Sequence, residues 1–113
     1  IMINGDSTLS PTNEANSLFK LEFYEDENQD GYYDPNTEDR LEVEFDVDWN
    51  GWKMVSYKYS DLILAWDSGG NAIREPNKII KFRTLLLANP ESGFAKADVD
   101  YIVWSEGSSI LNQ

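Results

Sequence analysis

Hydrophobic and polar residues alternate with period two along much of the chain. The clearest run covers residues 40–49, in which charged residues alternate with apolar ones. Its apolar positions are Leu41, Val43, Phe45, Val47 and Trp49. Because successive side chains of a strand point to opposite faces, this run predicts a half-buried strand with one solvated face, as is common in antiparallel sheets.

Other stretches add strands to this pattern. Apolar or branched residues at alternating or closely spaced positions predict strands at 17–24, 52–59, 78–88 and 94–104. Residues 1–3 are expected to be the tail of a further strand. The pair Asn50-Gly51 favours left-handed backbone and predicts a tight hairpin between the runs 40–49 and 52–59. No segment has a helical period bounded by caps, so we expect an all-β fold with antiparallel strands, a β-sandwich or a barrel.

Length and composition indicate one folded domain over residues 1–113. The 113 residues are 41% hydrophobic and 13% aromatic, which lies outside the disordered class. The sequence shows no internal repeat and no linker. It has no apolar run long enough to span a membrane and no signal peptide. Since the chain starts abruptly on an apolar triplet, we expect it to be a piece of a longer protein.

Charge narrows the range of partners. The formal net charge is −12, which argues against nucleic acid and anionic membranes as partners. Twelve of the 21 acidic residues fall between Glu22 and Asp48, so the acidity is local and favours a cation or an uncharged ligand. There is no histidine and no cysteine, which excludes the commonest transition-metal ligands. Carboxylates and carbonyls remain, and these oxygen ligands suit calcium.

The stretch DENQDGYYD at residues 26–34 has the spacing of an oxygen-rich metal loop. A glycine, Gly31, stands where such a loop turns sharply. The candidate ligands are Asp26, Asn28, Asp30, Asp34, the carbonyl of Tyr32 and the later Glu38. The flanking segments are predicted strands, so the stretch resembles the D-x-D-x-D-G-x-x-D calcium loop of β-hairpins and differs from an EF-hand. The alternative is a solvated hairpin tip, because Asn, Asp and Gly favour turns without any ion.

Residues 46–62 carry a family resemblance. An acidic strand, the sequence NGWKMVS and a Ser-Asp-Leu ending are similar to carbohydrate-binding modules and surface glycan-binding domains of the galactose-binding-like jelly-roll fold, and residues 97–104 resemble their last strand. The resemblance implies a jelly-roll sandwich that binds polysaccharide or oligosaccharide without catalysis and is stabilised by calcium. Earlier strands of that fold are missing here, so an incomplete sandwich, closed by self-association or by the missing strands, is expected.

Aromatic side chains are the candidate sugar platforms, because sugar rings pack their C–H faces on exposed aromatic rings. The candidates are Trp49, Trp52, Trp66 and Tyr33. Trp49 continues the inward face of its strand, so a place in the core is the competing interpretation for this residue. Trp66 precedes the long loop 68–77, where exposure is expected.

These observations predict a non-catalytic carbohydrate-binding module of a bacterial secreted or cell-surface protein. The alternative is a structural or assembly domain of a larger surface lipoprotein or glycoside hydrolase, with no ligand of its own. A hydrolase is a third interpretation, since paired carboxylates are abundant. The acids nevertheless lie on a solvated face and a loop tip, where nothing raises the pKa of one of them for acid catalysis, so we expect no enzymatic activity.

Overall fold

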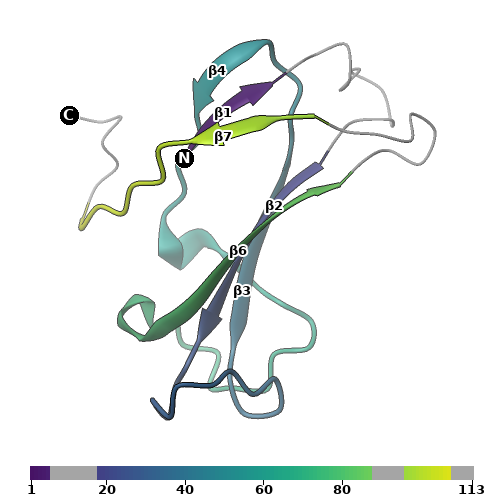
Figure 1. The fold of residues 1–113 in the computed structure, drawn as a ribbon. Coiled ribbons are helices and arrows are strands. Elements are labelled where there is room, and N and C mark those ends of the chain that lie inside the picture. The colour runs from purple at the N-terminus through teal and green to yellow at the C-terminus, as the bar shows by residue number, and fades with distance from the viewer. Residues whose placement is uncertain (6–17, 88–95, 108–113) are drawn as a thin grey trace. The chain divides into compact units, whose positions relative to one another are not determined.

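The computed structural model describes residues 1–5, 18–87 and 96–107. These residues form seven strands and two short 3₁₀ turns, η1 (Tyr59–Asp61) and η2 (Pro76–Lys78). The strands make two antiparallel sheets, one of three strands and one of four, as a β-sandwich has (Figure 1). The prediction of an all-β antiparallel fold with little helix is confirmed.

The chain divides into two compact parts. The first comprises residues 1–19, 44–58 and 86–113, and the second comprises residues 20–43 and 59–85. Strands β2 (Leu18–Glu25), β3 (Arg40–Asp46) and β6 (Ile79–Leu87) each contribute residues to both parts. The two parts are described separately below, and a single domain over the whole chain stays a prediction. Within the described residues, no helix has the length and apolarity that a membrane crossing requires.

The three-stranded sheet belongs to the first part. Strand β1 (Met2–Gly5) lies in its centre, with β4 (Gly51–Met54) on one side and β7 (Asp98–Asp100) on the other, both antiparallel to it. The Ile3 side chain of β1 is completely buried. The opening residues are therefore the central strand of a sheet, where the sequence pattern indicated only the tail of one.

Aromatic rings stack on one another in the first part, where Phe19 is buried, Phe45 and Trp49 are half-buried and Tyr57 is exposed. Phe45 stacks against Phe19 with ring centroids 5.5 Å apart, and against Tyr57 at 5.8 Å. The Trp49 ring lies parallel to Phe45 at 6.4 Å, and its indole N–H donates to the carbonyl of Ile3. The alternation that begins in β3 thus continues to supply core residues beyond the end of the strand.

The four-stranded sheet, in the order β5-β3-β2-β6, provides the second part with its core. Strand β5 (Ile63–Leu64) pairs antiparallel with β3, with Leu41 opposite Leu64. Buried Phe23 contacts the ring of Phe82 on β6 at 5.1 Å. The three long strands β2, β3 and β6 follow the predicted runs closely, because period-two alternation marks β2 and β3 and a run of branched apolar residues marks β6 (Figure 1).

The hairpin predicted at Asn50-Gly51 is wrong. Gly51 does adopt the left-handed conformation, with φ +81°. However, β3 ends at Asp46 and belongs to the four-stranded sheet, whereas β4 pairs with β1. A local turn signal gives the backbone conformation of the turn, but the partner of the next strand is decided by non-local pairing. In the 52–59 run only residues 52–54 belong to a strand, β4. Residues 94 and 95 of the 94–104 run lie outside the described residues, and within 96–104 the structure has only the short strand β7.

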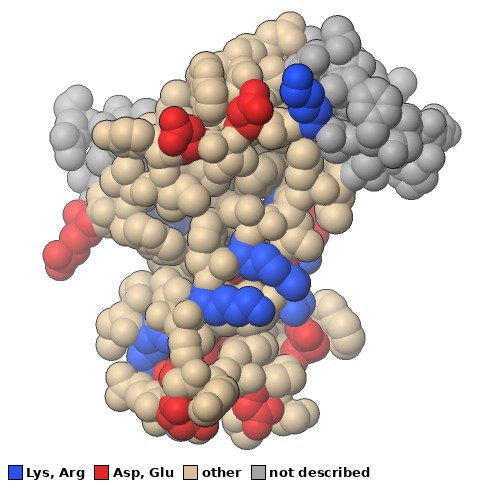
Figure 2. Space-filling model, viewed as in Figure 1, with Lys and Arg blue, Asp and Glu red and all other residues tan. Residues whose placement is uncertain are grey.

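Ion pairs cover one face of the four-stranded sheet. Buried Glu22 on β2 accepts hydrogen bonds from Arg83 on β6 and forms an ion pair with Arg40 on β3 at 3.1 Å. Lys20 pairs with Glu42 at 3.0 Å. Lys and Arg side chains gather over β6 in the view of Figure 2, and acidic side chains gather at the end of this part that holds the loop after β2.

Candidate metal centre

The acidic loop is anchored where β2 ends. The Glu25 N–H donates to the carbonyl of Asp39 at 3.0 Å, and the Asp26 N–H donates to the carbonyl of Lys78 at 2.9 Å. The backbone at the start of the loop is therefore held on both sides by its neighbours in the sheet. The loop leaves β2 after Glu25 and returns to β3 at Arg40.

Asp26 organises the first turn of the loop. Its two carboxylate oxygens accept the backbone N–H groups of Asp30, at 3.1 Å, and Gly31, at 2.8 Å. Gly31 has φ +90°, a conformation that glycine adopts without steric cost. Burial raises the pKa of Asp26, but the hydrogen bonds from Gly31 and Asp30 outweigh it, so the net pKa lies below the usual range. Asp26 is thus held as a carboxylate.

Glu38 brings a second buried carboxylate to this turn. Its side chain is among the most buried in the described chain, and its Oε1 accepts the Asp34 N–H at 2.8 Å. Its other oxygen, Oε2, is buried and has no hydrogen-bond donor among the described residues. Oxygens of Asp26, Asp30 and Glu38 all lie within 4.8 Å of one another. We call these three residues the first acidic cluster.

The first acidic cluster fits a hard cation. Three carboxylates converge, and no Lys or Arg of the described chain forms an ion pair with them. Calcium takes six to eight oxygens, which leaves room for water or further protein oxygens. Glu38 joins the cluster although it comes one residue later than the last ligand of an EF-hand. Because strands flank the loop, the EF-hand spacing does not apply.

The remaining predicted ligands have other positions. Asp34 is outside the first acidic cluster; its Oδ1 accepts two bonds from Asn36 and closes a second turn. The Asn28 side chain lies beside Asp30, with its oxygen accepting the Asp30 N–H at 3.1 Å. Tyr32 donates its N–H to Asp30, and its ring is exposed. The structure therefore brings together three of the six predicted metal residues, with Asn28 adjacent to them.

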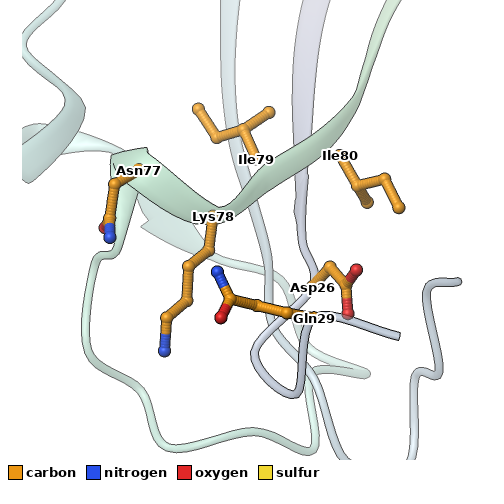
Figure 3. A pocket seen from close by; sticks show the side chains of 6 residues that line it. All are labelled: Asp26, Gln29, Asn77, Lys78, Ile79 and Ile80. Carbon is orange, nitrogen blue, oxygen red and sulfur yellow. The ribbon is translucent and has the colours of Figure 1, made fainter. Parts of the chain in front are cut away.

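A shallow hollow lies beside this loop, lined by Asp26, Gln29, Asn77, Lys78, Ile79 and Ile80. Figure 3 shows the Asp26 carboxylate pointing away from the ammonium group of Lys78. This lysine is therefore not the counter-ion of Asp26. The hollow mixes a carboxylate, two amides and two isoleucines, so it does not itself indicate one ligand.

The structure also shows a second acidic cluster that the sequence did not indicate. Oxygens of Glu25, Glu27 and Glu75 lie within 4.8 Å of one another. Glu75 comes from the 68–77 loop, about fifty positions along the chain from the other two, so spacing could not reveal the group. Burial raises the pKa of both Glu25 and Glu27.

Backbone N–H groups of the 68–77 loop donate hydrogen bonds to carboxylates of the second acidic cluster and to Asp39. Gly70 and Ala72 donate to Asp39, at 3.0 and 2.7 Å. Asn71 donates to Glu27 at 3.2 Å, and Glu75 donates to Glu25 at 2.7 Å. The acidic side chains therefore fix the path of a loop that has little regular secondary structure of its own.

The predicted sugar platforms differ in exposure. Trp66 is 91% exposed and Trp52 is 52% exposed, so both rings are accessible in the isolated chain. Trp49 is half-buried, and its ring stacks on that of Phe45. Tyr33 is half-buried and packs edge-on against Tyr24 at 4.8 Å, and burial raises the pKa of its hydroxyl to about 12. Trp66 and Trp52 thus remain the platform candidates.

Comparison with protein-family models, with curated proteins and with solved structures found no match for this chain.

Proposed function

We propose that this chain is a calcium-binding β domain, in which one calcium ion is held by the first acidic cluster. The observation that carries the proposal is the Oε2 of Glu38. It is buried and has no donor among the described residues, and Glu38 belongs to a group of three residues that includes Asp26. A buried carboxylate oxygen without a partner is costly, and a bound cation removes that cost.

The rest of the loop supports this ion. The bonds that Asp26 and Asp30 accept are short backbone bonds, which orient the carboxylates and leave other lone pairs for a metal. The ion's role is structural, since it joins the start of the loop, at Asp26, to its end, at Glu38. Both residues adjoin strands of the same sheet.

Isothermal titration calorimetry of the metal-stripped chain tests this proposal. Calcium is expected to bind the wild type, and Asp30→Asn and Glu38→Gln are each expected to weaken that binding at least about tenfold. Asp61→Asn, which removes one exposed charge outside the cluster, is the matched control and is expected to bind normally. Wild-type binding that survives Glu38→Gln and Asp30→Asn unchanged would refute the site.

A second function, non-catalytic carbohydrate binding, is favoured by the exposure of Trp66. This ring is the most exposed large hydrophobic side chain in the described chain. Asp67, the next residue in the sequence, forms an ion pair with Arg40 at 3.0 Å and supplies charged groups in the same segment of the chain. An aromatic face next to charged hydrogen-bonding groups is the chemistry that recognises a polysaccharide or oligosaccharide. A bacterial secreted or surface protein is the setting we propose for it.

Tryptophan fluorescence with a panel of soluble polysaccharides tests the second function. We expect one glycan to shift the emission of the wild type, and Trp66→Ala to abolish its binding in calorimetry. Trp52→Ala is the companion variant, because its ring is the other exposed candidate. Absence of a shift across neutral and acidic glycans would favour the alternative, a structural or assembly domain without a ligand. Release of reducing sugar over time would instead indicate a hydrolase.

A further inference from the structure

We propose that Glu25, Glu27 and Glu75 form a second divalent-cation site, in which the metal ion competes with the ammonium group of Lys78. This site lies apart from the first acidic cluster and uses none of its residues. It goes beyond the proposed function, and either site could exist without the other.

The geometry of β2 places these side chains. Successive residues at the end of an extended strand point to opposite sides. Accordingly, Glu25 belongs to the second cluster and Asp26 to the first. The returning segment repeats the pattern, because Glu38 belongs to the first cluster while Asp39 binds the loop that carries Glu75. Two cation sites on opposite sides of one pair of segments are therefore a consequence of strand alternation.

The Glu25 carboxylate is the second observation that points to a ligand. Glu25 is fully buried. Its Oε1 accepts bonds from the Tyr59 hydroxyl at 2.9 Å and from the Glu75 N–H at 2.7 Å. Its Oε2 is buried and has no donor among the described residues. Glu25, a member of the second cluster, thus has a buried carboxylate oxygen with no donor among the described residues, as Glu38 has in the first cluster.

The balance of charges around the second cluster also favours a bound cation. Four carboxylates gather around the 68–77 loop: those of Glu25, Glu27, Glu75 and Asp39. Lys78 is the cation of the described chain that pairs with this group; its Nζ lies 3.0 Å from Glu75 and 3.4 Å from the carbonyl of Glu27. One ammonium leaves this group with an excess of negative charge, and a divalent ion would offset it. Oxygen-only ligands favour calcium over softer metals.

Lys78 makes the proposal sharply testable. If a metal ion and the ammonium group share the carboxylate of Glu75, removing the ammonium charge must strengthen metal binding. Lys78→Met is expected to tighten the second site about tenfold. Lys81→Met is the matched control, because its ammonium lies 4.6 Å from the Tyr24 ring and forms no recorded ion pair in the described chain.

The experiment is calcium titration calorimetry on the full metal-stripped chain, with circular dichroism as a check that each variant is folded. The wild type is expected to bind two ions. Glu75→Gln and Glu38→Gln should each bind one ion. When Lys78→Met is added to Glu38→Gln, the remaining ion should bind more tightly.

The outcomes separate the two sites. If Glu38→Gln binds no calcium, the second site is refuted while the proposed function stands. If calcium binding is lost in Glu75→Gln and kept in Glu38→Gln, the second site stands and the proposed function fails. A wild type that binds no calcium at millimolar concentration refutes both. If Lys78→Met binds calcium no more tightly than Lys81→Met does, the proposed competition between the metal ion and Lys78 is refuted.

Discussion

Glu38 is buried to a degree that is rare for a carboxylate. It is 1% exposed, and only one of its two oxygens receives a hydrogen bond from the described residues. Glu25 repeats the combination in the second cluster. Charges in such positions are normally paired or bound to a metal, because desolvation is otherwise uncompensated. A buried carboxylate with a free oxygen is therefore stronger evidence for a cation than the acidic spacing of residues 26–34.

Replacing Glu38 by glutamine should affect the metal-free and calcium-bound chains in opposite ways. The glutamine keeps one oxygen for the Asp34 N–H and supplies an N–H₂ group that can donate to Asp26. Without metal, Glu38→Gln should raise the free energy of unfolding by about 1 kcal/mol. With saturating calcium the wild type should be the more stable protein. Urea unfolding with and without a chelator measures both, and a variant that is less stable in both conditions would contradict the account.

Two left-handed residues allow a paired test of backbone strain. Gly31 and Ala72 have φ +90° and +61°. Gly31→Ala should cost about 1 kcal/mol, because a side chain disfavours this conformation. Ala72→Gly should be close to neutral, since relief of strain offsets the greater freedom of the unfolded glycine. Chemical denaturation measures both variants. Equal effects of the two substitutions would show that backbone conformation does not govern the stability of the two loops that hold these residues.

Tyrosine ionisation gives a prediction for alkaline pH. Burial raises the pKa of Tyr33 to about 12, and burial followed by the bond to Glu25 raises that of Tyr59 further. Because the folded state favours the neutral phenol, the stability contributed is present below pH 10 and is lost as pH rises through the folded pKa. Ultraviolet difference absorbance should show a part of the tyrosine signal that changes only well above pH 10 and that Tyr33→Phe and Tyr59→Phe remove. A single transition for all tyrosines while the chain stays folded would refute this.

At the scale of elements, sequence alternation predicted the strands that are long and one-sided. Strands β2, β3 and β6 were found because their apolar residues recur with period two or form branched runs. Strand β7 lies within the predicted run 94–104 but has only three residues, and β1 has four, too few for a periodic signal to give their bounds. The loop after β2 was predicted from its own spacing. The contribution of Glu75 was not, because the contact depends on how the 68–77 loop returns to the end of β2.

The path of that returning loop depends on two glycines. A Cβ on Gly69 would meet the backbone carbonyl of Asn36, and one on Gly70 would meet the carboxylates of Glu27 and Asp39. Gly69→Ala should therefore destabilise the fold by about 2 kcal/mol, since backbone cannot move aside easily. Gly70→Ala should cost less, because side chains can shift, but it should weaken calcium binding at the second cluster.

Thermal unfolding and calorimetry measure these two effects. Ile73→Ala, which shortens an exposed side chain of the same loop, is the control and should change stability by less than about 0.5 kcal/mol. If Gly69→Ala is as stable as this control, the close approach of the loop to Asn36 is not required for folding.

For the whole molecule, the net charge of −12 favours cation binding, and the candidate cation sites are unevenly distributed along the chain. Both acidic clusters belong to the second part of the chain, which comprises residues 20–43 and 59–85. The buried core of the first part consists of Ile3, Phe19 and Val47. The proposed calcium ions would therefore be bound by the second part of the chain. Calcium at 100 times its dissociation constant would add about 2.7 kcal/mol to the state that binds it.

Hydrogen exchange can show where this stabilisation acts. On adding calcium, amides of residues 25–39 and 69–78 should exchange more slowly, because their N–H groups bind or adjoin the clustered carboxylates. Amides of β4 and β7 should change far less. The Glu38→Gln variant should lose the slowing at residues 26–38 and keep it at residues 70–75, where the second ion would act. Equal slowing in residues 25–39, residues 69–78, β4 and β7 would mean that calcium stabilises the chain as one cooperative unit. The effect of calcium would then not be confined to the second part.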